Sequence, residues 1–154
     1  MLKAAVLAVA LCLALISTLM ADEGGPKSDQ ELIQGTWKAV SVQLNGRSAD
    51  AVFVKEHRAT FTFRGDAFRI VEATTKERST QTGGSFTVDA KKSPKQMTLA
   101  TTNGPLKGHT TIIIFELTGD TLKVGMPAKP NWDGPPERFD QPDVATMVLE
   151  RIKE

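Results

Sequence analysis

The sequence predicts an all-β fold, an antiparallel up-and-down β-barrel of about eight strands with one short helix. Phe, Val and Ile alternate with polar residues over many short runs, which is the period-two pattern of half-buried strands. Pairs of Gly, Asn and Asp separate these runs, as hairpin turns do. Because no second helix is indicated that would cover a sheet, the apolar face must pack on another sheet or close on itself. The length of 154 residues, with 40% hydrophobic and 24% charged, fits one domain.

Residues 1–21 are typical of a secretory signal peptide. Lys3 supplies a positive charge, an unbroken apolar run follows from Ala4 to Ile16, and Ala21 offers a small residue at the cleavage point. We therefore expect cleavage after Ala21 and an exported protein, periplasmic or secreted, with no membrane span in the mature chain. The alternative is an uncleaved anchor, because the apolar segment reaches the lower length limit for crossing a bilayer.

Cysteine and charge limit the chemistry of the mature chain. Cys12 is the one cysteine of the sequence, so signal cleavage would leave neither a disulfide nor a thiol nucleophile. Leu11 directly before it argues against lipidation, which needs a small residue there. Loss of Lys3 reduces 19 Lys and Arg to 18, equal to the 18 Asp and Glu. A chain of near-zero charge without a basic stripe is not expected to bind nucleic acid.

A helical turn and one helix are expected early in the mature chain. Residues 22–30 are polar and contain Gly and Pro, so we expect a flexible N-terminus ahead of a barrel domain over 31–154. Ser28 and Glu31 have the spacing of a capping box for a short helical turn. Residues 48–56 are the best candidate for a helix.

Short strands account for most of the remaining domain. The polar segment 74–84 and the Pro-rich segment 126–143 separate some of them, and the latter must be an irregular loop because proline cannot donate to a strand ladder. The expected strands cover 37–44, 59–64, 68–70, 86–89, 97–99, 110–117, 122–124 and 146–152.

The first strand contains an ambiguity. Ala39, Ser41 and Gln43 share a face with Trp37, whereas Val40 and Val42 lie on the opposite face. Either the interior beside this strand is partly polar, or a β-bulge shifts the register.

Several segments resemble a known family. Gly35-Thr36-Trp37 looks like the Gly-x-Trp signature at the start of the first lipocalin strand. The wider pattern resembles an uncharacterised lipocalin-like domain family that is expanded in planctomycete bacteria, and the resemblance implies the barrel fold and export but no activity. The matching segments run in order over residues 31–152 and comprise 32–38, Asn45-Gly46, 103–105, Lys107-Gly108, 115–124, Arg138-Phe139 and 148–151.

The resemblance also implies roles for individual residues. In lipocalins the Trp of the signature closes one end of the barrel, and an Arg of the last strand lies across it. It therefore implies a structural, barrel-closing role for Gly35, Trp37 and Arg151, with ligand contact as the alternative for Trp37. Relatives often carry Cys where this chain has Gly125, so a function that depends on that thiol would be absent here.

The barrel interior is the candidate ligand site. An interior of this size is either filled by side chains or holds one small ligand, and the sequence leaves both open. The expected inward residues are Phe61, Phe63, Phe68, Ile70, Phe86, Val88, Met97, Leu99, Ile113, Phe115, Leu122, Val124, Met147 and Leu149. The candidate ligand-binding residues among them are Phe61, Phe63, Phe68, Ile70, Phe86 and Phe115.

Catalytic and metal-binding patterns are not found. His57 and His109 lack the spacing of a metal-binding helix pair, and each lies at a loop or strand end, where a solvated histidine is expected. Nucleophile elbows, phosphate-binding loops and dinucleotide fingerprints are absent from the sequence. We therefore expect no catalytic residue, metal or cofactor.

Three function classes remain at this point. The leading hypothesis is a noncatalytic exported protein that binds a small hydrophobic or amphipathic molecule inside the barrel. The second is a protein-interaction or inhibitor module that uses the Pro-rich loop 126–143, with an unknown partner. In that loop Trp132 is a candidate binding anchor, a lid over the barrel mouth, or a residue that packs the loop down. The third is an enzyme, for which the sequence offers no assembled site.

Overall fold

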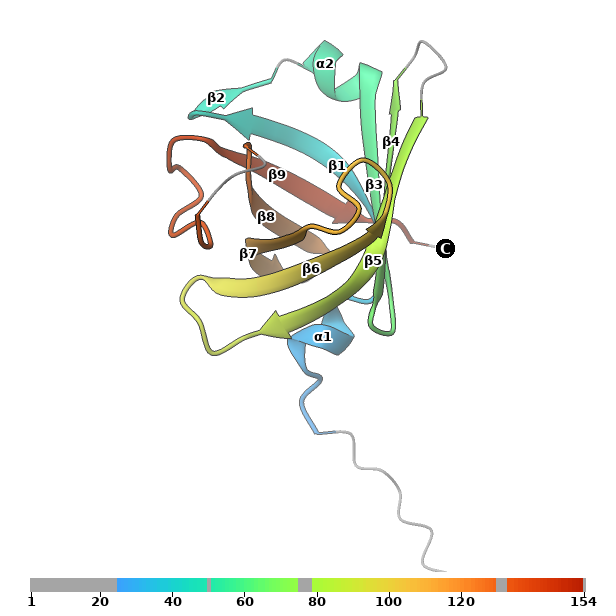
Figure 1. Ribbon diagram of the computed structural model, residues 1–154, viewed down its shortest axis with the longest axis vertical. Helices are drawn as coiled ribbons and strands as arrows, with labels where there is room; N and C mark the ends of the chain where they lie inside the picture. Colours follow the sequence, from blue (N-terminus) through green and yellow to red (C-terminus); the bar gives the residue numbers. More distant parts are fainter. Residues whose placement is uncertain (1–24, 50, 75–78, 130–132, 154) are drawn as a thin grey trace, which may run out of the picture.

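The computed structural model describes residues 25–49, 51–74, 79–129 and 133–153 (Figure 1). The predicted signal peptide, Cys12 and Trp132 lie outside these ranges. The described elements are α1 (Asp29–Leu32), β1 (Gly35–Leu44), β2 (Arg47–Ser48), α2 (Ala51–Glu56), β3 (His57–Arg64), β4 (Ala67–Thr74), β5 (Ser79–Asp89), β6 (Lys95–Asn103), β7 (Thr110–Thr118), β8 (Thr121–Pro127) and β9 (Val144–Arg151).

The strands form a closed antiparallel barrel, which confirms the predicted fold class. The neighbours run in the order β1-β3-β4-β5-β6-β7-β8-β9, and the pairing of β1 with β9 closes the ring. The short strand β2 is the extra one, because it pairs with the end of β1 beyond the eight-stranded wall. Closure leaves the eight strands of the wall without an unpaired edge.

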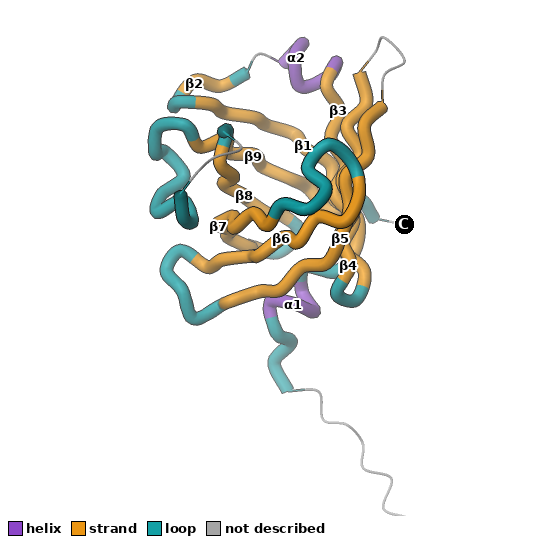
Figure 2. Tube along the Cα trace, viewed as in Figure 1, coloured by secondary structure: helices purple, strands orange, loops and turns teal. Residues whose placement is uncertain are grey.

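The two ends of the barrel differ. We call the closed end the one that carries α1, the β3–β4 turn, the β5–β6 connection, the β7–β8 turn and the end of β9. The open end carries α2, β2, the β6–β7 connection and the long β8–β9 connection, which is the long teal loop beside β8 and β9 in Figure 2. Figure 1 shows α1 and α2 at these opposite ends.

Several strands extend beyond the expected ranges, as β4 and β6 do, and three further boundary differences have a local cause. β5 begins at Ser79, within the polar segment 74–84, because inward threonines alternate with outward polar residues there and weaken the apolar signal. β8 extends to Pro127, where a proline is tolerated at the end of a strand, so the irregular loop is shorter than 126–143. The helix is shorter than 48–56, because Arg47–Ser48 pairs with β1 as a strand.

A β-bulge resolves the ambiguity of the first strand. The register of β1 against β9 shifts between Ala39 and Ser41, so Val40 is the extra residue. Beyond the bulge, Val42 lies opposite Met147 and Leu44 opposite Ala145. The apolar residues on both sides of the bulge thereby face the interior, and Val40 is exposed on the outside.

The interior consists of the residues that the alternation predicted. All the expected inward residues belong to one hydrophobic cluster, with Ile70 and Val88 partly buried at its margin. The expected inward set omitted Ile33 and Ala59, which also belong to the cluster, although Ala59 continues the alternation of Phe61 and Phe63. A separate group of buried residues lies on the outside of the barrel wall and comprises Ile114, Pro136 and Val144.

Candidate functional site

Trp37 and Arg151 meet at the closed end of the barrel. The Trp37 ring is fully buried, and its Nε1 donates a hydrogen bond to the carbonyl oxygen of Ile33 at 2.8 Å. Cζ of Arg151 lies 4.1 Å from the centroid of the Trp37 ring, which is a cation–π contact. This is the contact that the resemblance implies, with the Arg151 guanidinium lying over the indole ring.

Arg151 also connects three segments of the closed end. Its Nη2 donates to the carbonyl oxygen of Leu32 at 2.7 Å, its Nη1 to that of Gln34 at 2.5 Å, and its Nε to Oδ1 of Asp120 at 3.0 Å. Hydrogen bonding to Lys153 is the largest influence that holds the pKa of Asp120 below 3.8, and Arg151 acts in the same direction. A side chain added at Gly35 would meet Nη1 of Arg151 at 3.0 Å, so this glycine gives the guanidinium room.

The helical turn α1 is closed by its own cap and is held against the barrel by neighbouring polar contacts. Ser28 and Glu31 form the predicted capping box, and the hydrogen bond from the Ser28 backbone is the main cause of the lowered pKa of Glu31. Gln34 exchanges two hydrogen bonds with the backbone of Gly65 in the β3–β4 turn. Nζ of Lys95 lies 2.8 Å from Oδ2 of Asp29. The segment around α1 therefore covers the closed end and is tied to the β3–β4 turn and to β6.

The half of the interior next to α1 is densely packed. Five of the six candidate ligand-binding residues lie in this closed half with between 1% and 4% of their surface exposed, and they are Phe61, Phe63, Phe68, Phe86 and Phe115. The rings of Phe63 and Phe86 contact each other edge to face at 5.0 Å. These phenylalanines fill the closed half, and the sixth candidate, Ile70, lies partly exposed at its upper boundary.

The other half of the interior, the open half, has a different lining. Residues directly opposite each other on neighbouring strands share a face, so the register gives the inward set. Ile70 lies opposite Thr82, Glu72 opposite Thr80, and Leu99 opposite Thr111. Across β4 to β7 most inward positions of this half carry hydroxyl groups. These threonines are here called the threonine wall, which comprises Thr74, Thr80, Thr82, Thr101 and Thr111.

The strands across the barrel present an apolar wall. In the ring of eight strands β5 lies opposite β9, β4 opposite β8, and β6 opposite β1. The inward residues of β8, β9 and β1 in the open half comprise Val42, Leu44, Met126, Ala145 and Met147. Most of them are partly exposed, as are Thr82 and Thr111, so water reaches this half of the interior.

The hydroxyls of the threonine wall include groups that are open to a ligand. Within the described part of the chain, no hydrogen bond engages the hydroxyls of Thr82, Thr101 or Thr111. Thr80 donates a weak hydrogen bond of 3.4 Å to Oε2 of Glu72. Glu72 shares its inward face with buried Ala59, and its carboxylate is exposed at the rim.

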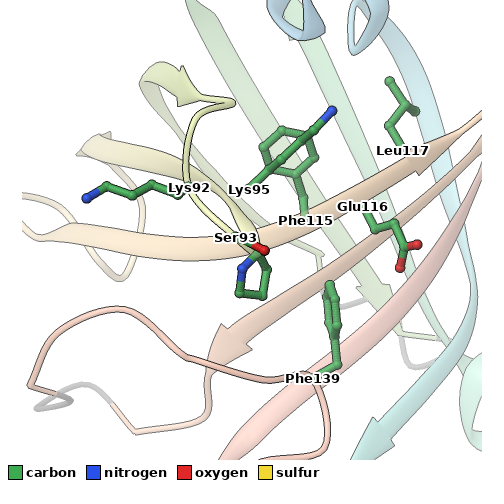
Figure 3. Close-up of a pocket in the computed structure, with 8 residues that line it drawn as sticks. Lys92, Ser93, Lys95, Phe115, Glu116, Leu117 and Phe139 are labelled. Carbon is green, nitrogen blue, oxygen red and sulfur yellow. The ribbon is translucent and has the colours of Figure 1, made fainter.

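A hollow of about 430 Å³ lies on the outer side of the barrel rather than in its mouth (Figure 3). The β5–β6 connection and the end of β7 line it, and Phe139 from the β8–β9 connection faces them across it. Its charged lining residues are Lys92, Lys95 and Glu116. Lys95 is engaged by Asp29, which leaves Lys92 and Glu116 as its unpaired charges among the described residues.

The described part of the long β8–β9 connection packs against the barrel wall. The Phe139 ring lies over Gly125, since a Cβ there would meet Cδ1 of that ring at 3.0 Å. Nζ of Lys123 lies 4.3 Å from the ring centroid, and Oγ1 of Thr146 donates to the carbonyl oxygen of Phe139 at 2.7 Å. Gly125, where the resembling family often has Cys, thus makes room for this aromatic ring.

The remaining candidates do not assemble into a site. His57 stacks on Phe53 at 4.1 Å, and His109 is an exposed residue of the β6–β7 connection. In the described ranges no three His, Cys, Asp or Glu residues are grouped so that they would hold a metal ion. No described helix is long and apolar enough to span a membrane.

Comparison with known proteins does not add an identity. No family model matches the chain, and no curated protein matches it. The resemblance to the lipocalin-like domain family therefore stays a prediction that rests on the quoted residues.

Sequence reasoning missed the two walls of the open half. The threonines of β5 lie in a segment without apolar alternation, and Met126 was assigned to an irregular loop. The signal was present as alternate threonines at Thr80 and Thr82 in step with Phe86, which a period-two search that admits threonine would have found.

Proposed function

We propose that this chain is a noncatalytic, exported binding protein that takes a small hydrophobic or amphipathic ligand in the open half of the barrel. The observation that carries the proposal is the division of the interior into a packed half and a half whose inward side chains are partly exposed. The apolar wall would gain about 25 cal/mol for each Å² of ligand surface that it buries. The threonine wall would supply the few hydrogen bonds that orient a ligand.

Binding is preferred over catalysis because of the residue types in the open half. Its described lining consists of threonines, aliphatic or thioether side chains, one carboxylate, Glu72, and one imidazole, His57, which lies opposite Thr74. General acid–base or nucleophilic catalysis needs a positioned pair of groups, such as a nucleophile beside a base. Glu72 accepts a hydrogen bond from Thr80, whereas His57 stacks on Phe53 and its Nδ1 contacts the Phe53 carbonyl oxygen, so these two groups are engaged elsewhere and do not form such a pair.

A second candidate function is protein interaction on the outer side of the barrel. The hollow beside Phe139 supports it, because it combines an aromatic ring, a type enriched at protein interfaces, with exposed charges. Under this second function Trp132, which belongs to the same β8–β9 connection, stays the candidate binding anchor. It predicts that Phe139→Ala abolishes capture of a partner and leaves uptake of small ligands unchanged.

Export is the part of the proposal that rests on the signal peptide. The chain recovered from an exporting host should begin at Asp22, directly after the expected cleavage. N-terminal sequencing or intact mass of the recovered protein measures this. A recovered chain that retains residues 1–21 would favour the uncleaved anchor.

Native mass spectrometry with a filling variant tests the binding proposal. The mature protein is incubated with a mixture of small hydrophobic and amphipathic molecules, and a reproducible added mass is expected. Ala145→Phe places a ring on the inward face of β9 and should abolish the added mass. Ala100→Phe on the outward face of β6 is the matched control and should retain it, since Ala100 lies opposite outward Ser85. A clean apo mass from every mixture would overturn the proposal.

A further inference from the structure

We infer that the ligand of the open half is a short amphiphile whose polar end donates hydrogen bonds, such as a primary amine or an alcohol, and that it is not a carboxylate. The inference rests on the proposed function and specifies its ligand class. Three features of the described residues carry it: the two unlike walls, the charge of the inward residues, and the depth at which the packed half begins.

The two walls fix the orientation of such a molecule. Met126, Ala145 and Met147 offer apolar surface on β8 and β9, while Thr80 and Thr82 present hydroxyls from the strand across the barrel. A ligand with apolar surface on all sides would leave the Thr82 hydroxyl without a partner among the described residues. An amphiphile that turns its polar end to β5 satisfies both walls.

The charge at the rim selects the polar end. Glu72 is the carboxylate among the described inward residues of the open half, and no lysine or arginine occupies an inward position of the eight-stranded wall there. His57 lies on the same face opposite Thr74, but its ring stacks on Phe53 and its Nδ1 contacts the Phe53 carbonyl oxygen at 3.1 Å. Arg47 continues the face of Leu44, but it lies on β2, outside that wall. An ammonium or hydroxyl group can donate to Glu72 and to the threonine hydroxyls, whereas a carboxylate donates nothing and is repelled by Glu72.

The packed half limits the length of the ligand. Ile70 marks its upper boundary, and the last residue of β4, Thr74, marks the rim. Four residues at about 3.3 Å each span about 13 Å along the strand, which is about 10 Å along the barrel axis at the usual strand tilt. A chain of roughly octyl length therefore fills the open half without displacing Phe61 or Phe68.

Three octyl compounds test the inference with the mature protein. Octylamine, octan-1-ol and octanoate share one chain and differ in the head group, and isothermal titration calorimetry gives the Kd of each near neutral pH. We expect octylamine to bind tightest and octanoate weakest. One unit charge at about 4 Å in water-like surroundings changes the Kd about fivefold, so the two charged probes should differ by about 25-fold.

Variants identify the residues that cause the difference in Kd among the three octyl compounds. Glu72→Gln should weaken octylamine about fivefold, strengthen octanoate and leave octan-1-ol unchanged. Glu150→Gln on the outward face of β9 is the matched control and should change none of the three, because Glu150 lies opposite outward Lys38. Thr82→Val removes one wall hydroxyl at equal shape and should weaken the amine and the alcohol together. Urea unfolding of each variant confirms that it is folded.

The outcomes separate the inference from the proposed function. Binding of octanoate as tightly as octylamine would overturn the inference and leave the proposed function standing. If Arg47→Gln then abolished octanoate binding, the carboxylate head group would lie beside Arg47 of β2. An unchanged order of the three probes in Glu72→Gln would also overturn it. Failure of all three to bind would overturn the proposed function and the inference with it.

Discussion

Arg151→Met is the sharpest test of how the closed end is held. The substitution keeps an apolar stem over Trp37 but removes the guanidinium that donates to the carbonyls of Leu32 and Gln34. The Leu32 carbonyl belongs to an exposed residue and regains water, whereas Gln34 is half-buried and its carbonyl regains water less completely.

The magnitude follows from the lost contacts. A hydrogen bond from a charged group to a half-buried carbonyl contributes about 1.5 kcal/mol or more, and the cation–π contact about 0.5–2 kcal/mol. We expect Arg151→Met to lower the free energy of unfolding by about 2–4 kcal/mol, which corresponds to a Tm lower by about 10 °C for a domain of this size. Arg151→Lys keeps the charge but lacks the planar guanidinium, so it should lower the free energy of unfolding by about half as much.

Urea unfolding followed by tryptophan fluorescence measures this loss. The sequence has two tryptophans, so a Trp132→Phe background leaves Trp37 as the single reporter. Arg69→Met is the control, because Arg69 is exposed on the outward face and donates to Gln81; its effect should stay within about 0.5 kcal/mol. An Arg151→Met protein as stable as that control would refute the view that Arg151 holds α1 and Trp37 together.

Three further outcomes follow from the packing. Phe86→Ala should lower the free energy of unfolding by about 3–5 kcal/mol in urea, because the ring is buried in the closed half, and a loss below about 1 kcal/mol would contradict dense packing there. Gly84→Ala should lower it by about 3 kcal/mol or more, since the added Cβ would lie 1.9 Å from the carbonyl oxygen of Ala100, whereas Gly25→Ala meets no atom and should have no effect. The lowered pKa of Asp120 stabilises the fold at pH values above the ordinary carboxyl pKa of 3.8, and this stabilisation is lost as the pH falls through the lowered pKa. The free energy of unfolding of Asp120→Asn should therefore depend less on pH below about pH 4 than that of the unaltered protein, and an equal dependence would count against the contact.

Alternation along the strands made most of the fold predictable. The inward phenylalanines, the capping box at Ser28 and the hairpin turns are all local patterns, and each is present in the structure. The bulge at Val40 was predictable as an alternative, because Trp37 and Val42 had to face the same interior. Closure of the sheet was expected because the sequence indicates no second helix that would cover its apolar face, and the pairing of β1 with β9 provides it.

The chemistry of the open half was harder to predict because it depends on strands that are distant in sequence. Which residues face each other across the barrel is set by the strand order and register, and the sequence of β5 alone gives neither. The large phenylalanines therefore looked like the ligand lining, whereas the structure places them in the packed half and leaves Ile70 at its boundary. The contact of Phe139 with Gly125 was equally hidden, since it depends on how an irregular connection folds back on the wall.

Methyl NMR of the methionines tests the division of the interior most directly. After signal cleavage three methionines would remain, of which Met97 lies in the packed half and Met126 and Met147 line the open half. We expect octylamine to shift the methyl signals of Met126 and Met147, to leave that of Met97 in place, and to lose this effect in Ala145→Phe. A shift confined to Met97, or equal shifts at all three, would contradict a barrel that is packed in one half and open to a ligand in the other.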